Sequence, residues 1–280
     1  MSDALRKNIL LVDDEVLIGM ATKQQLEKIG YVVVLASNGE QALQMLRQNN
    51  EISLVLMDID LGNGKNGIMV CQEIIKEKNI PIVFVSSHTD PGTVSLTEQV
   101  TSYGYIVKSS SMTVYDASIK MAYKLFNEKK EKDIYSKYLE TALNNAEEPV
   151  FICDLKGDVI FFNKAYLHIQ GLSEPQQIQS RFDEYSKLLR VFSDNGIPLE
   201  KNDWASTRGL RGLSAENVVF YVYHYRLNKM LINYFSYAPI YDDDSLIIGS
   251  YVKILRNVEH PDQMVIGKIL KELNLPDIAI

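Results

Sequence analysis

Ile9-Leu10-Leu11-Val12-Asp13-Asp14-Glu15 joins a strand-sized apolar run to three consecutive carboxylates. Further apolar runs lie at residues 31–35, 52–57, 80–85 and 104–107. Segments with apolar residues at three- and four-residue spacing separate them, at 16–29, 39–48 and 67–78, and a last one starts near Met112. Apolar strands that alternate with helices are typical of a parallel sheet covered on both faces. We therefore expect a doubly wound α/β domain of five strands and five helices.

Polar residues stand at the carboxyl ends of these strands. They are Asp13 and Asp14 after the first, Asp58 and Asp60 after the third, Ser86 at the end of the fourth, and Lys108 after the fifth. Because ligands of such sheets bind where the carboxyl ends meet, we expect these side chains to converge. Clustered carboxylates repel one another, and Mg²⁺ relieves that repulsion. An aspartate beside a metal, an amine and a hydroxyl is equipped to form an acyl phosphate.

The motifs Ile-Leu-Leu-Val-Asp13-Asp14-Glu15, Met-Asp58-Ile-Asp-Leu, Pro81-Ile-Val-Phe-Val-Ser86-Ser87 and Gly104-Tyr105-Ile-Val-Lys108 resemble the response-regulator receiver family over residues 6–126. The resemblance implies a flavodoxin-like fold, phosphorylation of Asp58 by a sensor histidine kinase, and a bound Mg²⁺. Its metal ligands would be Asp13, Asp14, Asp58 and the backbone carbonyl of Asp60. Lys108 and Ser86 would contact the phosphoryl group, and Ser86 and Tyr105 would form the switch.

Two features depart from that family's pattern. Ser109 stands where the family usually has a proline, so the loop after Lys108 lacks the rigidity that a proline would impose. The segment Leu61-Gly-Asn-Gly-Lys-Asn-Gly67 is also longer and richer in glycine than the usual loop after the phosphoacceptor. This variant resembles receivers of large multidomain sensor proteins more than those fused to DNA-binding domains.

The second half of the chain has the pattern of an antiparallel sheet. Val150–Cys153 and Val159–Phe162 flank a hairpin turn, a helical middle follows, and long strands are expected at 218–227, 230–240 and 246–255. The segment 145–165, the later Trp204 to Gly212 and the final hairpin resemble a PAS sensor domain over residues 135–258. The resemblance implies an α+β module for sensing or dimerisation.

A cofactor in this second half is not identified by the sequence. Cys153, His168 and His224 lack the context of a flavin or haem ligand, so each is interpreted as a packed or surface residue. We expect a pocket that is empty or holds a small molecule, and Trp204 is interpreted as a residue that plugs the fold. Phe220, Tyr221, Tyr223 and Tyr225 follow strand periodicity, which predicts one core face and one partner surface.

A helix without proline or glycine can run from Met112 to about Ala146, with Met121, Leu125, Tyr135, Leu139, Ala142 and Ala146 at seam-like spacing. It is interpreted as a linker helix that pairs as a coiled coil, or as two helices around a solvated kink. We expect four regions: a receiver domain at 1–128, the linker helix at 129–146, a PAS domain at 147–259, and a tail at 260–280 with a helix near 265–273.

Composition narrows the class of protein. The 280-residue chain has a net charge of −7 and no basic block, so we expect no nucleic-acid partner. It has no apolar run near the ~20 residues of a membrane helix and no signal peptide, and its two cysteines suit a reducing compartment. We therefore expect a cytoplasmic protein without membrane insertion, and a homodimer formed through the linker helix or the PAS domain.

The expected function is two-component signal transduction, in which the state of Asp58 passes through the linker helix to the PAS domain. No histidine-bearing kinase helix and no glycine-rich ATP site follow the second domain, so the chain is not expected to be an enzyme. It is either a stand-alone adaptor or the front end of a longer sensor kinase. The alternatives are a non-switching dimerisation scaffold, marked by Ser109, and a phosphatase that uses Asp58 as nucleophile and Asp60 as acid and base.

Overall fold

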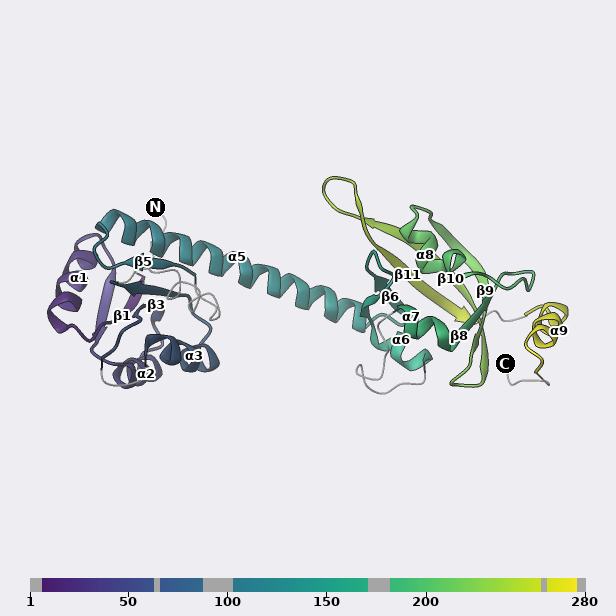
Figure 1. The fold of residues 1–280 in the computed structure, drawn as a ribbon, viewed down its shortest axis with the longest axis horizontal. Coiled ribbons are helices and arrows are strands. Elements are labelled where there is room, and N and C mark those ends of the chain that lie inside the picture. The colour runs from purple at the N-terminus through teal and green to yellow at the C-terminus, as the bar shows by residue number, and fades with distance from the viewer. Residues whose placement is uncertain (1–6, 63–65, 88–102, 171–181, 258–260, 276–280) are drawn as a thin grey trace. The chain divides into compact units, whose positions relative to one another are not determined.

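The computed structural model describes residues 7–62, 66–87, 103–170, 182–257 and 261–275 (Figure 1). The chain divides into two compact units, Met1–Tyr135 and Ser136–Ile280, which are described separately. One is a parallel α/β unit and the other is built on an antiparallel sheet. The predicted fold class is confirmed for both units.

The first unit has a five-stranded parallel sheet in the order β2-β1-β3-β4-β5. The strands are β1 (Asn8–Val12), β2 (Val32–Ala36), β3 (Ile52–Asp58), β4 (Ile82–Ser86) and β5 (Tyr105–Val107). The helices described here are α1 (Val16–Lys28), α2 (Gly39–Gln48), α3 (Gly67–Glu77) and α5 (Met112–Asn144). The helix expected between β4 and β5 falls on residues 88–102, outside the described residues.

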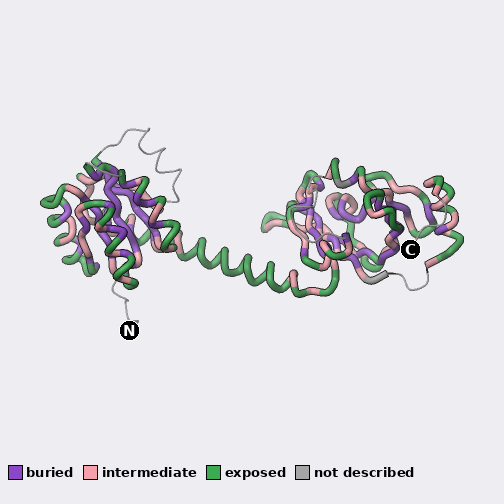
Figure 2. Tube along the Cα trace, turned by 90° about the horizontal axis from the view of Figure 1, so that it is seen from below, coloured by how far each residue is buried: buried purple, intermediate pink, exposed green. Residues whose placement is uncertain are grey.

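Alternate side chains of the strands build two cores, one on each face of this sheet. Leu10 and Val12 pack with α2 and α3, whereas Ile9 and Leu11 pack with α1 and the start of α5. Figure 2 shows buried chain at the centre of this unit and exposed chain around it. With both faces covered, open space for a ligand is left at the ends of the strands.

Helix α5 is continuous over 33 residues, so the alternative of two helices around a kink is wrong. Its first turns belong to the core of the first unit through Tyr115, Ile119 and Ala122. The tyrosines Tyr31 and Tyr123 add polar contacts, to Asp116 and Ser53 respectively. From residue 127 to residue 142 the helix is exposed, and Figure 2 shows this long exposed stretch.

The second unit has a six-stranded antiparallel sheet in the order β7-β6-β11-β10-β9-β8. Its strands are β6 (Val150–Cys153), β7 (Val159–Phe162), β8 (Leu189–Phe192), β9 (Ala215–His224), β10 (Lys229–Tyr241) and β11 (Ile247–Asn257). Its helices are α6 (Lys164–Ile169), α7 (Phe182–Tyr185), η2 (Ser186–Leu188), η3 (Lys201–Asp203), α8 (Ala205–Leu210) and α9 (Gln263–Glu272).

Two expectations for this unit are wrong. The middle segment is not purely helical, because Leu189–Phe192 pairs with β9 as strand β8. The second face of β9 is not an open partner surface over its whole length, because α9 covers part of it: Ile266 and Ile269 pack with Tyr221 and Tyr223. Strand pairing and helix docking are both contacts between distant segments, and local residue patterns do not report them.

Candidate functional site

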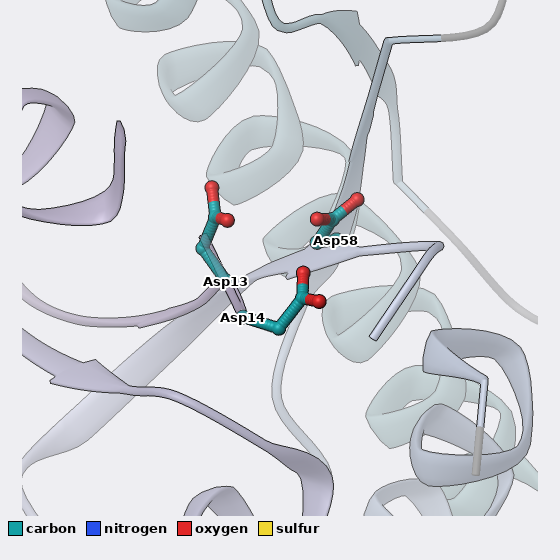
Figure 3. Close-up of side chains that lie close together, drawn as sticks. All are labelled: Asp13, Asp14 and Asp58. Atoms are coloured by element: carbon teal, nitrogen blue, oxygen red, sulfur yellow. The ribbon is translucent and has the colours of Figure 1, made fainter. Parts of the chain in front are cut away.

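The strand ends of the first unit bring the predicted carboxylates together (Figure 3). Asp13 and Asp14 directly follow β1, and Asp58 is the last residue of the neighbouring strand β3. One carboxylate oxygen from each of the three lies within 4.8 Å of the others. Asp13 and Asp58 are buried, whereas Asp14 is half-buried. Such a group of oxygens suits a hard divalent cation, which would remove the mutual repulsion of the carboxylates.

Lys108 is the cation at this cluster. Its ammonium nitrogen Nζ lies 2.6 Å from Oδ2 of Asp58, 3.2 Å from Oδ1 of Asp13 and 3.1 Å from Oε1 of Glu15. The strand pairing places it there, since the Lys108 backbone N–H donates to the carbonyl of Ser86, which ends β4. An ammonium group in this position can pair with Asp58 itself or with an oxygen of a group bound to Asp58.

Burial decides the protonation behaviour of the two inner aspartates. Removal from water raises the pKa of Asp58 from 3.8 to about 6, although the hydrogen bond and charge of Lys108 act against that rise. The pKa of Asp13 is also raised, again by burial first and against Lys108. The carboxylates themselves favour the charged ammonium, so the pKa of Lys108 is raised despite its own burial. A site whose carboxylates are this poorly solvated favours a bound cation.

Backbone geometry explains the glycines around the site. Helix α3 starts against the end of β3, so a side chain at Gly67 would collide with the carbonyl oxygen of Asp58. Gly62 has a φ of +61°, and a Cβ there would lie 2.8 Å from Oδ2 of Asp14. The glycine-rich segment therefore lets the loop after β3 pass close to the carboxylates. Residues 63–65 of that loop lie outside the described residues.

The remaining residues predicted for the site lie around its edge. Ser86 is fully buried at the end of β4, and Tyr105 is half-buried at the start of β5. Asp60 is exposed, and its backbone N–H donates to Oδ1 of Asp58 at 3.2 Å. Ser109 is exposed in the turn after Lys108. Their roles in metal binding and switching stay predictions.

The second unit encloses a cavity of about 70 Å³ between its sheet and helices. Most of its lining is apolar, including Trp204, and its polar lining residues include His224, Asn233, Gln170 and Ser206. His224 is buried, its Nδ1 accepts from the Leu227 backbone N–H at 3.2 Å, and burial lowers the pKa of its imidazole. Oδ1 of Asn233 is buried without a hydrogen-bond partner among the described residues. The cavity is thus an apolar pocket with a few inward polar groups.

The single cysteine and the other histidine singled out in this half differ in position. Cys153 lines the cavity, and burial raises the pKa of its thiol to about 12. At neutral pH the thiol is therefore protonated and unreactive. His168 is exposed on α6 and does not line the cavity. These surroundings give neither Cys153 nor His168 the features of a cofactor ligand.

Asn163 is a junction residue whose role sequence reasoning missed. Its side chain is fully buried, and its Oδ1 accepts from the backbone N–H groups of Val150 and Tyr166, both at 3.0 Å. Its Nδ2 donates to the carbonyls of Leu143 at 3.0 Å and Glu148 at 2.8 Å. One amide thus joins the end of α5, the start of β6 and the start of α6. Asn just before an apolar helical stretch was the available signal, because Asn is a preferred helix N-cap.

Comparison with known proteins agrees with this architecture. Residues 9–120 match the family model of the response regulator receiver domain, and residues 137–206 match that of the PAS domain. The chain joins a receiver domain to a PAS domain. The predicted resemblance to these two families is confirmed, and the chain is a two-component signalling protein.

Two relatives of this receiver–PAS chain are named as transcriptional regulators. A probable transcriptional regulator ycf27 of Guillardia theta is 28% identical over 198 residues, 71% of each chain. The transcriptional regulatory protein YrkP of Bacillus subtilis is 34% identical over 130 residues, 45% of this chain and 54% of the relative. The chain thus spans only about half of that second relative. The relatives are named as transcriptional regulators, so the expectation that this chain has no nucleic-acid partner stays a prediction.

Among solved structures, the N-terminal domain of a response regulator/sensory box/GGDEF three-domain protein from Carboxydothermus hydrogenoformans is 34% identical. The match covers 44% of this chain and 98% of that domain, with a TM-score of 0.42. Among the described residues, no helix is long and apolar enough to cross a membrane. The cytoplasmic location stays a prediction.

Proposed function

We propose that the receiver domain accepts a phosphoryl group on Asp58, with Mg²⁺ bound by Asp13, Asp14 and Asp58 and by the backbone carbonyl of Asp60. The observation that carries this proposal is the joint position of the three carboxylates and Lys108 at neighbouring strand ends. The cation supplies charge neutralisation for the incoming phosphoryl oxygens. The donor is a histidine kinase, since receiver domains in general take their phosphoryl group from one.

In this proposal the side chains of the chain divide the work. An Asp58 carboxylate oxygen attacks phosphorus, and the bond between phosphorus and the donor atom breaks, so an acyl phosphate forms on Asp58. Lys108 moves its ion pair from the Asp58 carboxylate to a phosphoryl oxygen. The Ser86 hydroxyl donates to another phosphoryl oxygen, and Tyr105 follows the movement of Ser86.

The output of this event passes through α5 to the PAS domain. The first turns of α5 lie in the receiver core through Tyr115 and Ile119. Its last turn is joined to the PAS domain by the Asn163 amide and by Asn144, whose Oδ1 accepts from the Lys164 backbone N–H at 3.0 Å. A helix that is held at both ends is suited to transmit a change of position or pairing. The chain itself acts as a signalling protein and not as an enzyme.

The proposal is tested by the intact mass of the protein after incubation with Mg²⁺ and acetyl phosphate. We expect the wild type to gain one acid-labile phosphoryl group and the Asp58→Asn variant to gain none. Lys108→Ala serves as the matched site control and should slow the gain without removing the acceptor. No gain in the wild type with acetyl phosphate or with a phosphorylated kinase domain would overturn the proposal and favour the scaffold. Steady release of phosphate from small phosphomonoesters would instead favour the phosphatase.

A further inference from the structure

Helix α5 has two apolar faces, and among the described residues only one of them is packed in a core. Tyr115, Ile119 and Ala122 are buried in the receiver core. Met121 and Leu125 are 52% and 44% exposed on the same turns. Because an α-helix rotates by about 100° per residue, Met121 lies on the side of the helix away from Ile119, and Leu125 lies at the border between the two sides. A second apolar face on a helix already packed by its first is typical of a helix with a further partner.

The exposed face continues down the helix as a regular stripe. The α5 stripe is defined by Met121, Leu125, Glu128, Lys132, Tyr135 and Leu139. Its spacing alternates between four and three residues, which is the seam of a two-stranded coiled coil. Tyr135 and Leu139 are 68% and 65% exposed, so the C-terminal residues of the stripe are also exposed to solvent. Glu128 and Lys132 are the charged positions within this otherwise apolar seam.

The order of residues along the stripe selects the occupant and its direction. In a parallel pair of identical helices, every seam residue faces its own copy, so Glu128 would face Glu128 and Lys132 would face Lys132. Like charges in facing positions destabilise such a pair. In an antiparallel pair centred on residue 130, Glu128 faces Lys132 twice. The same register places Leu125 against Tyr135 and Met121 against Leu139, so that each apolar residue meets an apolar residue.

We propose that α5 pairs with α5 of a second copy of this chain in antiparallel orientation, in the register that sets Glu128 against Lys132. The stripe is self-complementary about its centre only in this direction. The heptad positions agree, since each proposed layer joins an a position to a d position, as antiparallel pairing of two helices requires. This pairing specifies how two chains meet, and it does not depend on phosphorylation of Asp58.

The direction is tested by disulfide trapping in the full-length chain. A tagged Met121→Cys chain is mixed with an untagged Leu139→Cys chain under mild oxidation. Antiparallel pairing should give the mixed disulfide dimer well above either same-variant dimer, because two copies of residue 139 would lie roughly 27 Å apart along the axis. Lys130→Cys, on the opposite face of the helix, is the matched control and should give no dimer. The native Cys71 and Cys153 are buried and should not contribute.

Three other results would overturn the proposal. Same-variant dimers of Met121→Cys or Leu139→Cys would show parallel pairing. Absence of all disulfides would place the contact of any dimer outside α5, and a monomer in sedimentation analysis would exclude the pair altogether. All three substituted residues are exposed, so circular dichroism and thermal unfolding should match the wild type and exclude misfolding as the cause.

The register is tested separately by charge exchange. Lys132→Glu makes both central layers Glu against Glu and should raise the dimer dissociation constant about tenfold. Glu128→Lys should have the same effect with Lys against Lys. A mixture of the two variants restores opposite charges in both layers, and it should associate more tightly than either variant alone. Equal dissociation constants for all samples would show that these layers lie outside the interface.

Discussion

At the scale of single residues, Asp58 shows how folding sets the chemistry of a carboxylate. The end of β3 buries the side chain and Lys108 lies 2.6 Å away, yet the pKa of Asp58 rises to about 6. The ion pair with Lys108 therefore compensates only part of the loss of hydration. The proposed cation at the three carboxylates, or a phosphoryl group that takes over Lys108, would relieve the remainder.

The raised pKa of Asp58 predicts a pH-dependent stability in metal-free buffer. Its folded pKa of about 6 lies above the ordinary 3.8, so the folded state binds the proton more tightly. Receiver stability should then fall as the pH rises from about 4 to 6 and should stay level above that. At pH 7, Asp58→Asn should be more stable than the wild type by about 1–3 kcal/mol in chemical denaturation. Parallel pH profiles for the two proteins would contradict the raised pKa.

At the scale of elements, the two ends of helix α5 make its packing and hydrogen-bond contacts with the folded domains. Asn163 is the clearest case, because one buried amide satisfies the last turn of α5 and the first residues of β6 and α6. A residue with all four hydrogen-bond positions used by backbone groups has no equal substitute.

Asn163→Ala should destabilise the PAS domain by about 2–4 kcal/mol, because it removes the buried hydrogen bonds to the Val150 and Tyr166 N–H groups and the part-buried ones to the Leu143 and Glu148 carbonyls. Thermal or urea unfolding followed through PAS-domain signals would measure the loss. Asn163→Asp is the matched control, because its side chain still accepts from Val150 and Tyr166 but cannot donate to Leu143. If the accepted bonds contribute, the loss of unfolding free energy for Asn163→Asp should lie between that of Asn163→Ala and zero. A wild-type stability for Asn163→Ala would show that the junction is not held by this amide.

The packing of α9 on the PAS sheet gives a second prediction for an element. Ile269 is fully buried with Tyr221 and Tyr223, whereas Met264 on the same helix is 86% exposed. Ile269→Ala should lower the free energy of unfolding by about 2–4 kcal/mol, because it opens a cavity in this second core. Met264→Ala should change it by less than about 0.5 kcal/mol. Similar effects for the two variants would show that α9 does not pack on the sheet.

At the scale of the whole molecule, the chain divides into two units that each have their own cores. The receiver cores lie on the two faces of its parallel sheet, and the PAS cores lie on the two faces of its antiparallel sheet. A protein built in this way is expected to unfold in more than one step, because each unit is cooperative by itself. Ligands of one unit should then stabilise that unit first.

Calorimetry with Mg²⁺ tests this organisation. We expect two unfolding transitions, of which Mg²⁺ moves only the one assigned to the receiver, by about 2.7 kcal/mol at a hundredfold excess over its dissociation constant. Asp14→Asn should remove most of that shift while leaving the PAS transition in place, because Asp14 is one of the three clustered carboxylates. A single transition that moves as a whole would show instead that the two units unfold together.

The sequence alone predicted the receiver site because the necessary rules are local. Asp13, Asp58, Ser86 and Lys108 each stand where an apolar strand ends, and parallel strands have their carboxyl ends on one edge of the sheet. The continuous helix from Met112 and the final three strands of the PAS domain were likewise visible as residue periodicity. These features depend on residues close in the chain and on a topology rule common to such sheets.

Only the tertiary structure decided the remaining features. Leu189–Phe192 is a strand because β9 offers an edge for pairing, and Tyr221 and Tyr223 are buried because α9 packs over them. The raised pKa of Asp58 and the four bonds of Asn163 likewise depend on groups that are distant in sequence. Hydrophobic burial and hydrogen bonding act between whatever surfaces the folded chain brings together, so a local pattern shows that a face is apolar but not what covers it.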